Sequence, residues 1–184
     1  MATTANEVLD FWFNELAPPD WFKKSDQTDA AITSRFRETH ADLMKSRAAD
    51  WRSTPADRLA AVIVLDQFSR NMFRGTPAMF ASDPLALEVA LEAIDAGDLS
   101  LHAPERGLFL LLPLEHAEDM ALQDRCVALM RDIFPKPGNT YVDFAERHRD
   151  VIERFGRFPH RNDTLGRAST PAEQAFLQQP GSGF

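Results

Sequence analysis

Helix-start signals recur along this chain, and they constrain its fold more than any other feature. Thr54-Pro55 and Thr170-Pro171 each place a hydroxyl before a proline, and Asp83-Pro84 does the same with a carboxylate. Such side chains satisfy free backbone N–H groups at a helix start, where proline is also well tolerated. Between these signals the apolar residues follow helical spacing, without the alternation of a strand. The chain is therefore predicted to be all-α, with about seven to nine helices joined by short connections.

The domain organisation follows from length and from the character of the C-terminus. Residues 1–177 are predicted to form a single all-helical domain, because 184 residues suit one core. Residues 178–184 are predicted to be a flexible tail, since chain ends rich in small residues are poorly ordered unless tied down. Near the tail, the last long helix should pack through Phe144, Val151, Ile152 and Phe155, and should end at Gly156.

Two predicted helices are apolar on every face, Leu59–Leu65 and Leu108–Leu114. Both should therefore be buried, and Pro113 is expected to kink or break the second. Each run ends in polar residues, and a buried helix that turns polar at one end directs that end to a cleft or to the surface. Asp66 and Arg70 are four residues apart, which favours an ion pair on one helix face. The polar residues of interest are Asp66, Arg70, Asn71 and Arg74 after the first run, and Glu115, His116 and Glu118 after the second.

The segment Phe155–Arg167 is basic, although the chain has a formal net charge of −8. Gly156 and Pro159 restrict its backbone, and arginine forks suit carboxylate and phosphate groups. Two interpretations are open: a rigid loop that binds an anion, or a helix end whose arginines pair with the protein's own acids. The polar residues of this segment are Arg157, His160, Arg161, Asn162 and Arg167.

Four segments follow one another along the chain: FWF, LDQFSRNMFRGTPAMFASD, PLEHAEDMALQ and FGRFPHRNDTLGRASTPAEQAFL. In this order they resemble a bacterial domain-of-unknown-function family, number nine-two-four, from Phe11 to Leu177. The resemblance implies an all-helical, tetratricopeptide-like fold of stacked helical hairpins, and it implies no established activity. The sequence has no repeat of about 34 residues, so any repeat character is structural.

Composition excludes several classes of partner. A net charge of −8 opposes binding to DNA, RNA or an anionic membrane, because the field of the protein repels phosphate. No apolar run approaches the ~20 residues of a membrane span, and the N-terminus lacks the pattern of a signal peptide. The single cysteine, Cys126, cannot form an internal disulfide and is interpreted as a small buried hydrophobe. We expect a cytoplasmic protein that binds neither nucleic acid nor membrane.

No metal or other cofactor is predicted. His116 and Glu118 are two residues apart and would point to different sides of a helix, unlike the H-E-x-x-H arrangement. His148 should be a buried histidine of a packing face, whereas His40 and His102 are expected to be exposed. If a reaction is catalysed, His116 with Glu115 or Glu118 is the best acid–base pair, since imidazole titrates near neutral pH.

The function favoured by these patterns is binding of a small anionic ligand, a carboxylate or a phosphate, in a rigid pocket rich in arginine and histidine. Two alternatives are a helical-repeat adaptor that binds a peptide or protein partner, and a metal-dependent hydrolase. Whether the protein is an enzyme stays open. The predicted ligand-binding residues are Asp66, Arg70, Asn71, Arg74, His148, Arg157, His160, Arg161, Asn162 and Arg167.

Overall fold

The computed structural model describes residues 3–183, which form helices and contain no β-strand, so the all-helical prediction is confirmed. None of the described helices combines the length and the apolar character needed to cross a bilayer. The α-helices are α1 (Ala5–Asp10), α2 (Asp26–Ser46), α3 (Pro55–Val62), α4 (Ser69–Met72), α5 (Asp83–Asp95), α6 (Pro104–Glu115), α7 (Met120–Ile133), α8 (Thr140–Phe155) and α9 (Pro171–Leu177). Short 3₁₀ or π segments are η1 (Phe11–Glu15), η2 (Pro18–Asp20), η3 (Ala49–Trp51), η4 (Ile63–Phe68), η5 (Pro77–Phe80), η6 (Asp98–Leu101) and η7 (Pro159–Arg161).

The chain divides into two compact units. The first takes the chain up to Arg74 together with Ala78–Pro113, and the second takes Gly75–Pro77 and the chain from Leu114 onward. The prediction of one single domain was made from length alone, and it stays a prediction.

In the first unit, α3, η4 and α4 follow one another without a break, and η4 is a π-helical segment. The apolar run Leu59–Leu65 is completely buried there, as predicted. The π segment was not predicted from the sequence. Its Phe68 ring packs against the rings of Phe11, Trp12 and Phe36. A π segment widens the helix locally and is often found at functional sites.

Local capping was predicted correctly at two of three helix starts. The hydroxyl of Thr54 accepts from Asp57 N, and Thr170 forms a complete capping box with Glu173. At the third start the prediction of an Asp83 cap was wrong, because α5 already includes Asp83. The Asp83 carboxylate instead accepts from Arg70 at 2.9 Å. The helix also continues through Pro113 to Glu115, so proline does not break it.

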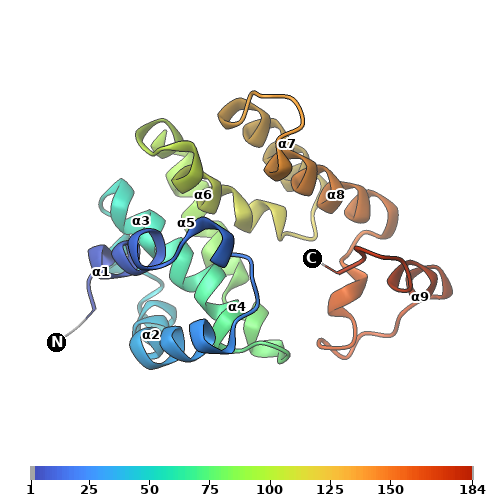
Figure 1. The fold of residues 1–184 in the computed structure, drawn as a ribbon, viewed down its shortest axis with the longest axis horizontal. Helices are drawn as coiled ribbons and strands as arrows, with labels where there is room; N and C mark the ends of the chain where they lie inside the picture. Colours follow the sequence, from blue (N-terminus) through green and yellow to red (C-terminus); the bar gives the residue numbers. More distant parts are fainter. Residues whose placement is uncertain (1–2, 184) are drawn as a thin grey trace. The chain divides into compact units, whose positions relative to one another are not determined.

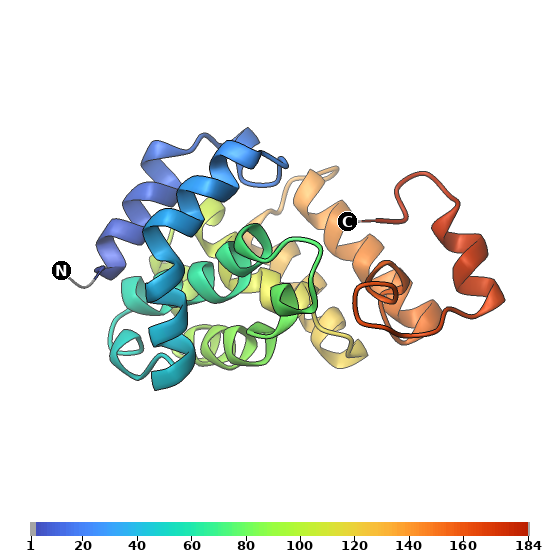
Figure 2. The same ribbon diagram turned by 90° about the horizontal axis from the view of Figure 1, so that it is seen from below.

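In the second unit, α7 and α8 lie side by side as a helical hairpin (Figure 1). After α8 the chain forms short helical turns joined by loops, with α9 in red in Figure 2. Gly156 ends α8 with φ 70°, a left-handed conformation that favours glycine, and its N–H donates to Ile152 O. The prediction that Phe144 packs in the core was wrong, because this residue is 43% exposed.

The buried polar residues partly match the predictions. Cys126 and His148 are buried, as expected. His40 was expected to be exposed but is buried, and its Nε2 lies 3.3 Å from Ser82 Oγ. His102 is half-buried rather than exposed. The spacing of residues along the sequence does not show which histidines are buried, because their burial depends on neighbouring helices.

Candidate functional site

Phe158 is the centre of a polar cluster in the second unit, although its own side chain is fully buried. The guanidinium carbon of Arg161 lies 4.6 Å from the centroid of the Phe158 ring. The rings of His148 and His160 lie 5.5 Å and 5.6 Å from it. We call Glu115, His116, His148, His160 and Arg161 the imidazole cluster. Its members come from the C-terminal end of α6, from α8 and from η7, all of them sequence-predicted residues.

The side chains of Glu115 and His148 are both buried in this cluster. His148 Nδ1 lies 2.9 Å from Phe144 O and 3.1 Å from Glu115 Oε1. A carbonyl oxygen can only accept, so Nδ1 carries the hydrogen and Nε2 of the neutral ring can only accept. The carboxyl group of Glu115 thus contacts an imidazole that α8 brings to it, a contact that the sequence analysis did not predict.

Burial keeps the imidazoles of His148 and His160 neutral near pH 7. It lowers the pKa of His148 to about 3, against the hydrogen bond to Phe144 O, and the neighbouring Arg161 guanidinium acts in the same direction as burial. Burial likewise lowers the pKa of His160 to about 4, with help from Arg161. Both rings are therefore hydrogen-bonding groups rather than charges at neutral pH.

Arg161 is buried on η7, where its Nη2 donates to His116 O at 2.9 Å. This carbonyl is one of those left without an intrahelical donor where α6 ends. A cation at a helix C-terminus is also favourable for the helix dipole. The same guanidinium stacks on Phe158, so its plane and position are fixed from two sides.

The other arginines of the loop hold carboxylates of the protein itself. Arg157 donates to both carboxylate oxygens of Glu173, at 2.6 Å and 2.8 Å. Arg167 does the same with Glu118, at 2.7 Å and 2.9 Å, so Glu118 is part of an ion pair. Asn162 is buried and bridges the loop, accepting from Arg167 Nε and donating to Ser169 Oγ. For these residues the structural interpretation of the loop is the better one.

The polar residues that follow Leu65 all find partners within the first unit. Asp66 is buried, and its Oδ1 lies 3.0 Å from Arg70 Nη1, which is the intrahelical pair expected from the spacing. Asn71 and Arg74 both donate to Asp29, at 2.7 Å and 2.8 Å. These residues and the imidazole cluster belong to different compact units. A pocket made jointly by both sets stays a prediction.

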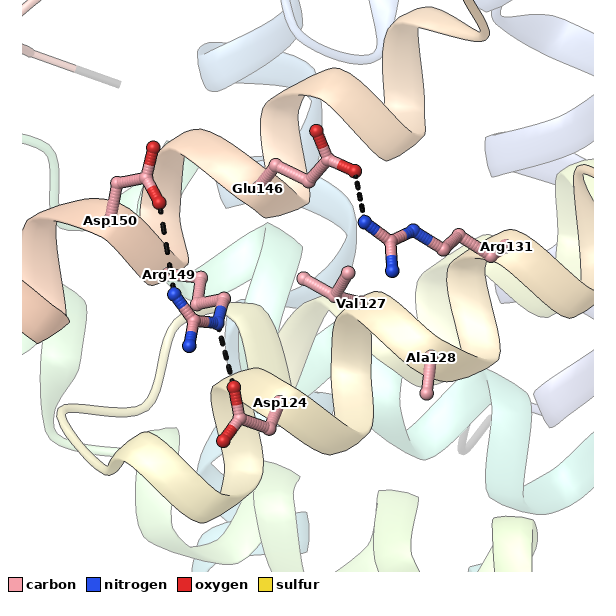
Figure 3. A pocket seen from close by; sticks show the side chains of 7 residues that line it. All are labelled: Asp124, Val127, Ala128, Arg131, Glu146, Arg149 and Asp150. Atoms are coloured by element: carbon pink, nitrogen blue, oxygen red, sulfur yellow. Dashed lines mark hydrogen bonds and ion pairs between the residues drawn. The ribbon is translucent and has the colours of Figure 1, made fainter. Parts of the chain in front are cut away.

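A hollow of about 460 Å³ lies on the α7–α8 hairpin (Figure 3). Arg131 reaches Glu146 across it at 2.7 Å, and Arg149 reaches Asp124 at 2.7 Å. Such exposed pairs contribute little to stability but join the two helices. No sequence-predicted site residue lines this hollow, whose lining consists of Asp124, Val127, Ala128, Arg131, Glu146, Arg149 and Asp150.

No group of three or more His, Cys, Asp or Glu side chains within residues 3–183 has an arrangement that could hold a metal ion. The imidazoles of His148 and His160 lie against the Phe158 ring, and the His116 and His148 centroids are 6.3 Å apart. Zinc needs its nitrogen ligands at about 2.0–2.1 Å from one point. No such convergence of three donors is found among the described residues.

Gln123 is a buried polar residue that the sequence analysis did not single out. It is fully buried on α7, and its Nε2 donates to the carbonyl oxygens of Glu115 at 2.6 Å and Ala117 at 2.8 Å. One signal could have revealed it. Gln123 lies three and four residues before Cys126 and Val127, which places a polar amide on the apolar face of the helix.

The comparisons with known proteins give relatives without a described activity. A family model described as a bacterial protein of unknown function, DUF924, matches residues 8–181. A solved structure of a protein of unknown function from Agrobacterium tumefaciens is 41% identical, with a TM-score of 0.88 over 95% of this chain and 96% of that one. The search of curated proteins found no match. None of these comparisons brings a ligand or a reaction with it.

Proposed function

The chain belongs to the DUF924 family of bacterial proteins, as its motifs predicted, and from its own geometry we propose that the imidazole cluster binds a small anionic ligand. The observation that carries this proposal is the buried guanidinium of Arg161, which stacks on the Phe158 ring beside the rings of His148 and His160. The ligand would be a carboxylate or a phosphate. The expectation of a cytoplasmic protein is kept as part of this proposal.

The chemistry of Arg161 supports an anion rather than another kind of ligand. A guanidinium offers five N–H donors in a planar fork, and it gains most over an ammonium when it grips two oxygens of one anion. Its observed bond to His116 O uses one nitrogen to fix the fork in place. Holding a donor group in position beforehand reduces the entropy lost on binding.

The histidines complete such a site. His116 and His160 are half-buried, so they form the side of the cluster that a ligand can reach. The neutral imidazole of His160 provides one donor and one acceptor and can adapt to a bound oxyanion. Arg157 and Arg167, by contrast, each hold a carboxylate in two places, and we assign them to the loop framework.

Thermal unfolding with added anions tests the proposal. Phosphate, sulfate or acetate should raise the melting temperature more than chloride at matched ionic strength. A ligand at 100 times its Kd adds about 2.7 kcal/mol by mass action. The increase should disappear in His160→Asn, a change that leaves the α6 cap formed by Arg161 intact.

Arg149→Gln is the matched control, because it removes an arginine from an exposed ion pair on α8. That variant should keep the full response to anions. If none of the three anions stabilises the wild-type protein beyond chloride, the proposal is wrong and Arg161 serves only to cap α6.

A further inference from the structure

A second hollow of the second unit lies where the end of α8 meets the start of α9. Its volume is about 530 Å³, the size of a site for a small molecule. None of the residues that line it belongs to the imidazole cluster, so it is a separate place for a ligand. The lining consists of Arg154, Phe155, Arg157, Thr170, Ala172 and Glu173.

Phe155 brings an aromatic surface to this hollow. Its ring centroid lies 5.1 Å from that of Phe176, and both side chains pack against the buried residues Val151, Ile152 and Phe158. Because the two rings are attached to the core, their surface is in place before a ligand arrives. A surface that is already ordered reduces the entropy lost on binding.

The guanidinium of Arg154 lies over both rings, with its carbon 4.7 Å from the centroid of Phe155 and 5.8 Å from that of Phe176. Arg154 is exposed, and no carboxylate within residues 3–183 forms an ion pair with it. Arg157, three residues further along the chain, holds both oxygens of Glu173 instead. The two arginines of this hollow therefore differ in what they bind.

Glu173 is the acid of this hollow, and it is already engaged. Its carboxylate accepts from Arg157 at 2.6 Å and 2.8 Å and from Thr170 N at 2.7 Å. The charges of Arg157 and Glu173 offset each other, so the positive charge of Arg154 is left over. A planar carboxylate is the natural partner of a guanidinium in this position.

We infer that this hollow binds a small carboxylic acid with a flat aromatic body, in its ionised form. Arg154 holds the carboxylate, and the ring of the ligand packs against Phe155 and Ala172. An anion the size of acetate or phosphate would leave most of a 530 Å³ hollow empty, so the ligand differs from the one proposed for the imidazole cluster. The inference goes beyond the proposed function and does not depend on it.

Three probes that share parts of one molecule test the inference on the wild-type protein by calorimetric titration. Benzoate carries both the carboxylate and the ring, acetate lacks the ring, and benzyl alcohol lacks the charge. We expect benzoate to bind about tenfold more tightly than either of the others, because burial of the ring adds to the charge pair. Equal Kd values for benzoate and acetate would overturn the inference.

Arg154→Gln tests where benzoate binds. The change removes an exposed charge, so the fold should be retained, and the Kd for benzoate should rise about fivefold, as expected for a partly exposed charge pair. Arg147→Gln is the matched control, because the Arg147 guanidinium lies 5.6 Å from the exposed Phe144 ring of the same helix, outside the hollow. An unchanged Kd in Arg154→Gln, or the same rise in both variants, would show that the hollow is not the site.

His160→Asn separates this inference from the proposed function. That variant should lose its stabilisation by phosphate and acetate but keep its Kd for benzoate. If benzoate binding is lost in His160→Asn and persists in Arg154→Gln, benzoate occupies the imidazole cluster, and the inference about the hollow is wrong while the proposed function stands.

Discussion

His148 and Glu115 form a buried pair in which Nδ1 of the imidazole lies 3.1 Å from Oε1 of the carboxyl group. They are 33 positions apart in the sequence, one at the end of α6 and the other in the middle of α8. Burial holds the pKa of His148 at about 3, so the ring is neutral wherever the protein is studied near pH 7. Protonation of this ring must therefore oppose folding.

The free energy of unfolding should fall as the pH falls below about 6.5. The pKa values of His148 and His160 are about 3 and about 4 in the folded protein, below the ordinary value of 6.5. Between these folded-state pKa values and 6.5, the unfolded chain binds more protons than the folded chain. The stability that the neutral histidines contribute is therefore fully present above pH 6.5 and is lost as the pH falls below it. Each histidine should contribute a slope of about 1.4 kcal/mol per pH unit. Urea denaturation at pH 7.5, 6.0 and 5.0 measures it.

His148→Gln should reduce this slope, whatever it does to stability at pH 7.5. Burial also lowers the pKa values of His40 and His102, so they add to the slope in both proteins and cancel in the difference. The same slope in His148→Gln and wild type would show that His148 titrates normally and is not buried neutral.

Removing the Asp66 carboxylate should destabilise the first unit. Asp66 is 1% exposed, and Arg70 would lose one of two acidic partners while Asp83 remains 2.9 Å away. Loss of a sole partner of a buried charge costs about 3–5 kcal/mol. Because Asp83 still compensates the charge, we expect Asp66→Ala to cost roughly 1–3 kcal/mol. Chemical denaturation measures this, and Asp42→Ala, at an exposed position of α2, is the control.

An unchanged denaturation midpoint in Asp66→Ala would mean that water, rather than Arg70, compensates this carboxylate. The buried end of the η4 segment would then be more open than the structure shows.

The pair of Arg157 and Glu173 should fasten α9 to the second unit. Glu173 is buried, and its hydrogen bonds with Arg157, together with those from Thr170, hold the pKa of its carboxyl group well below the ordinary value. Stability from this pair is therefore present above pH 4.5 and lost as the pH falls further. At pH 7, Arg157→Gln should speed amide hydrogen exchange in α9, and Arg149→Gln should not. Equal protection of α9 in Arg157→Gln and wild type would contradict this role.

Local features of the fold could be predicted from the sequence because their causes are local. The caps at Thr54 and Thr170 depend on residues within one turn, and the burial of Leu59–Leu65 follows from a face without polar groups. The π segment η4 could not be predicted, because it depends on how aromatic rings from other helices pack against Phe68.

The partners of the candidate site residues could not be predicted from sequence spacing. The sequence analysis proposed His116 with Glu115 or Glu118 as an acid–base pair, and it did not foresee that α8 brings His148 to the Glu115 carboxyl group. Arg157 was predicted to bind a ligand, and in the structure it holds Glu173 of the next helix start. Ion-pair partners depend on tertiary packing, which sequence spacing does not specify. Gln123 was missed because a glutamine in an amphipathic helix usually faces solvent.

The Phe158 ring should be needed for anion binding as well as for stability. It is fully buried and lies against Arg161, His148 and His160, so it sets the positions of three members of the imidazole cluster. Phe158→Leu keeps an apolar side chain but removes the flat surface and the cation–π contact, which is worth about 0.5–2 kcal/mol. We expect a moderate loss of stability and a larger loss of the melting-temperature increase produced by phosphate or acetate.

Phe155→Leu is the matched control for this prediction. Phe155 also carries an arginine over its ring, with Arg154 at 4.7 Å, but its other ring contact is Phe176 of α9. The same chemical change outside the imidazole cluster should leave the response to anions intact. If Phe158→Leu keeps the full response while Phe155→Leu loses it, the anion binds beside α9, where Arg154 and Arg157 line a separate hollow of about 530 Å³. The buried guanidinium of Arg161 would then have a structural role, because a ligand held by it would respond to the loss of the ring beneath it.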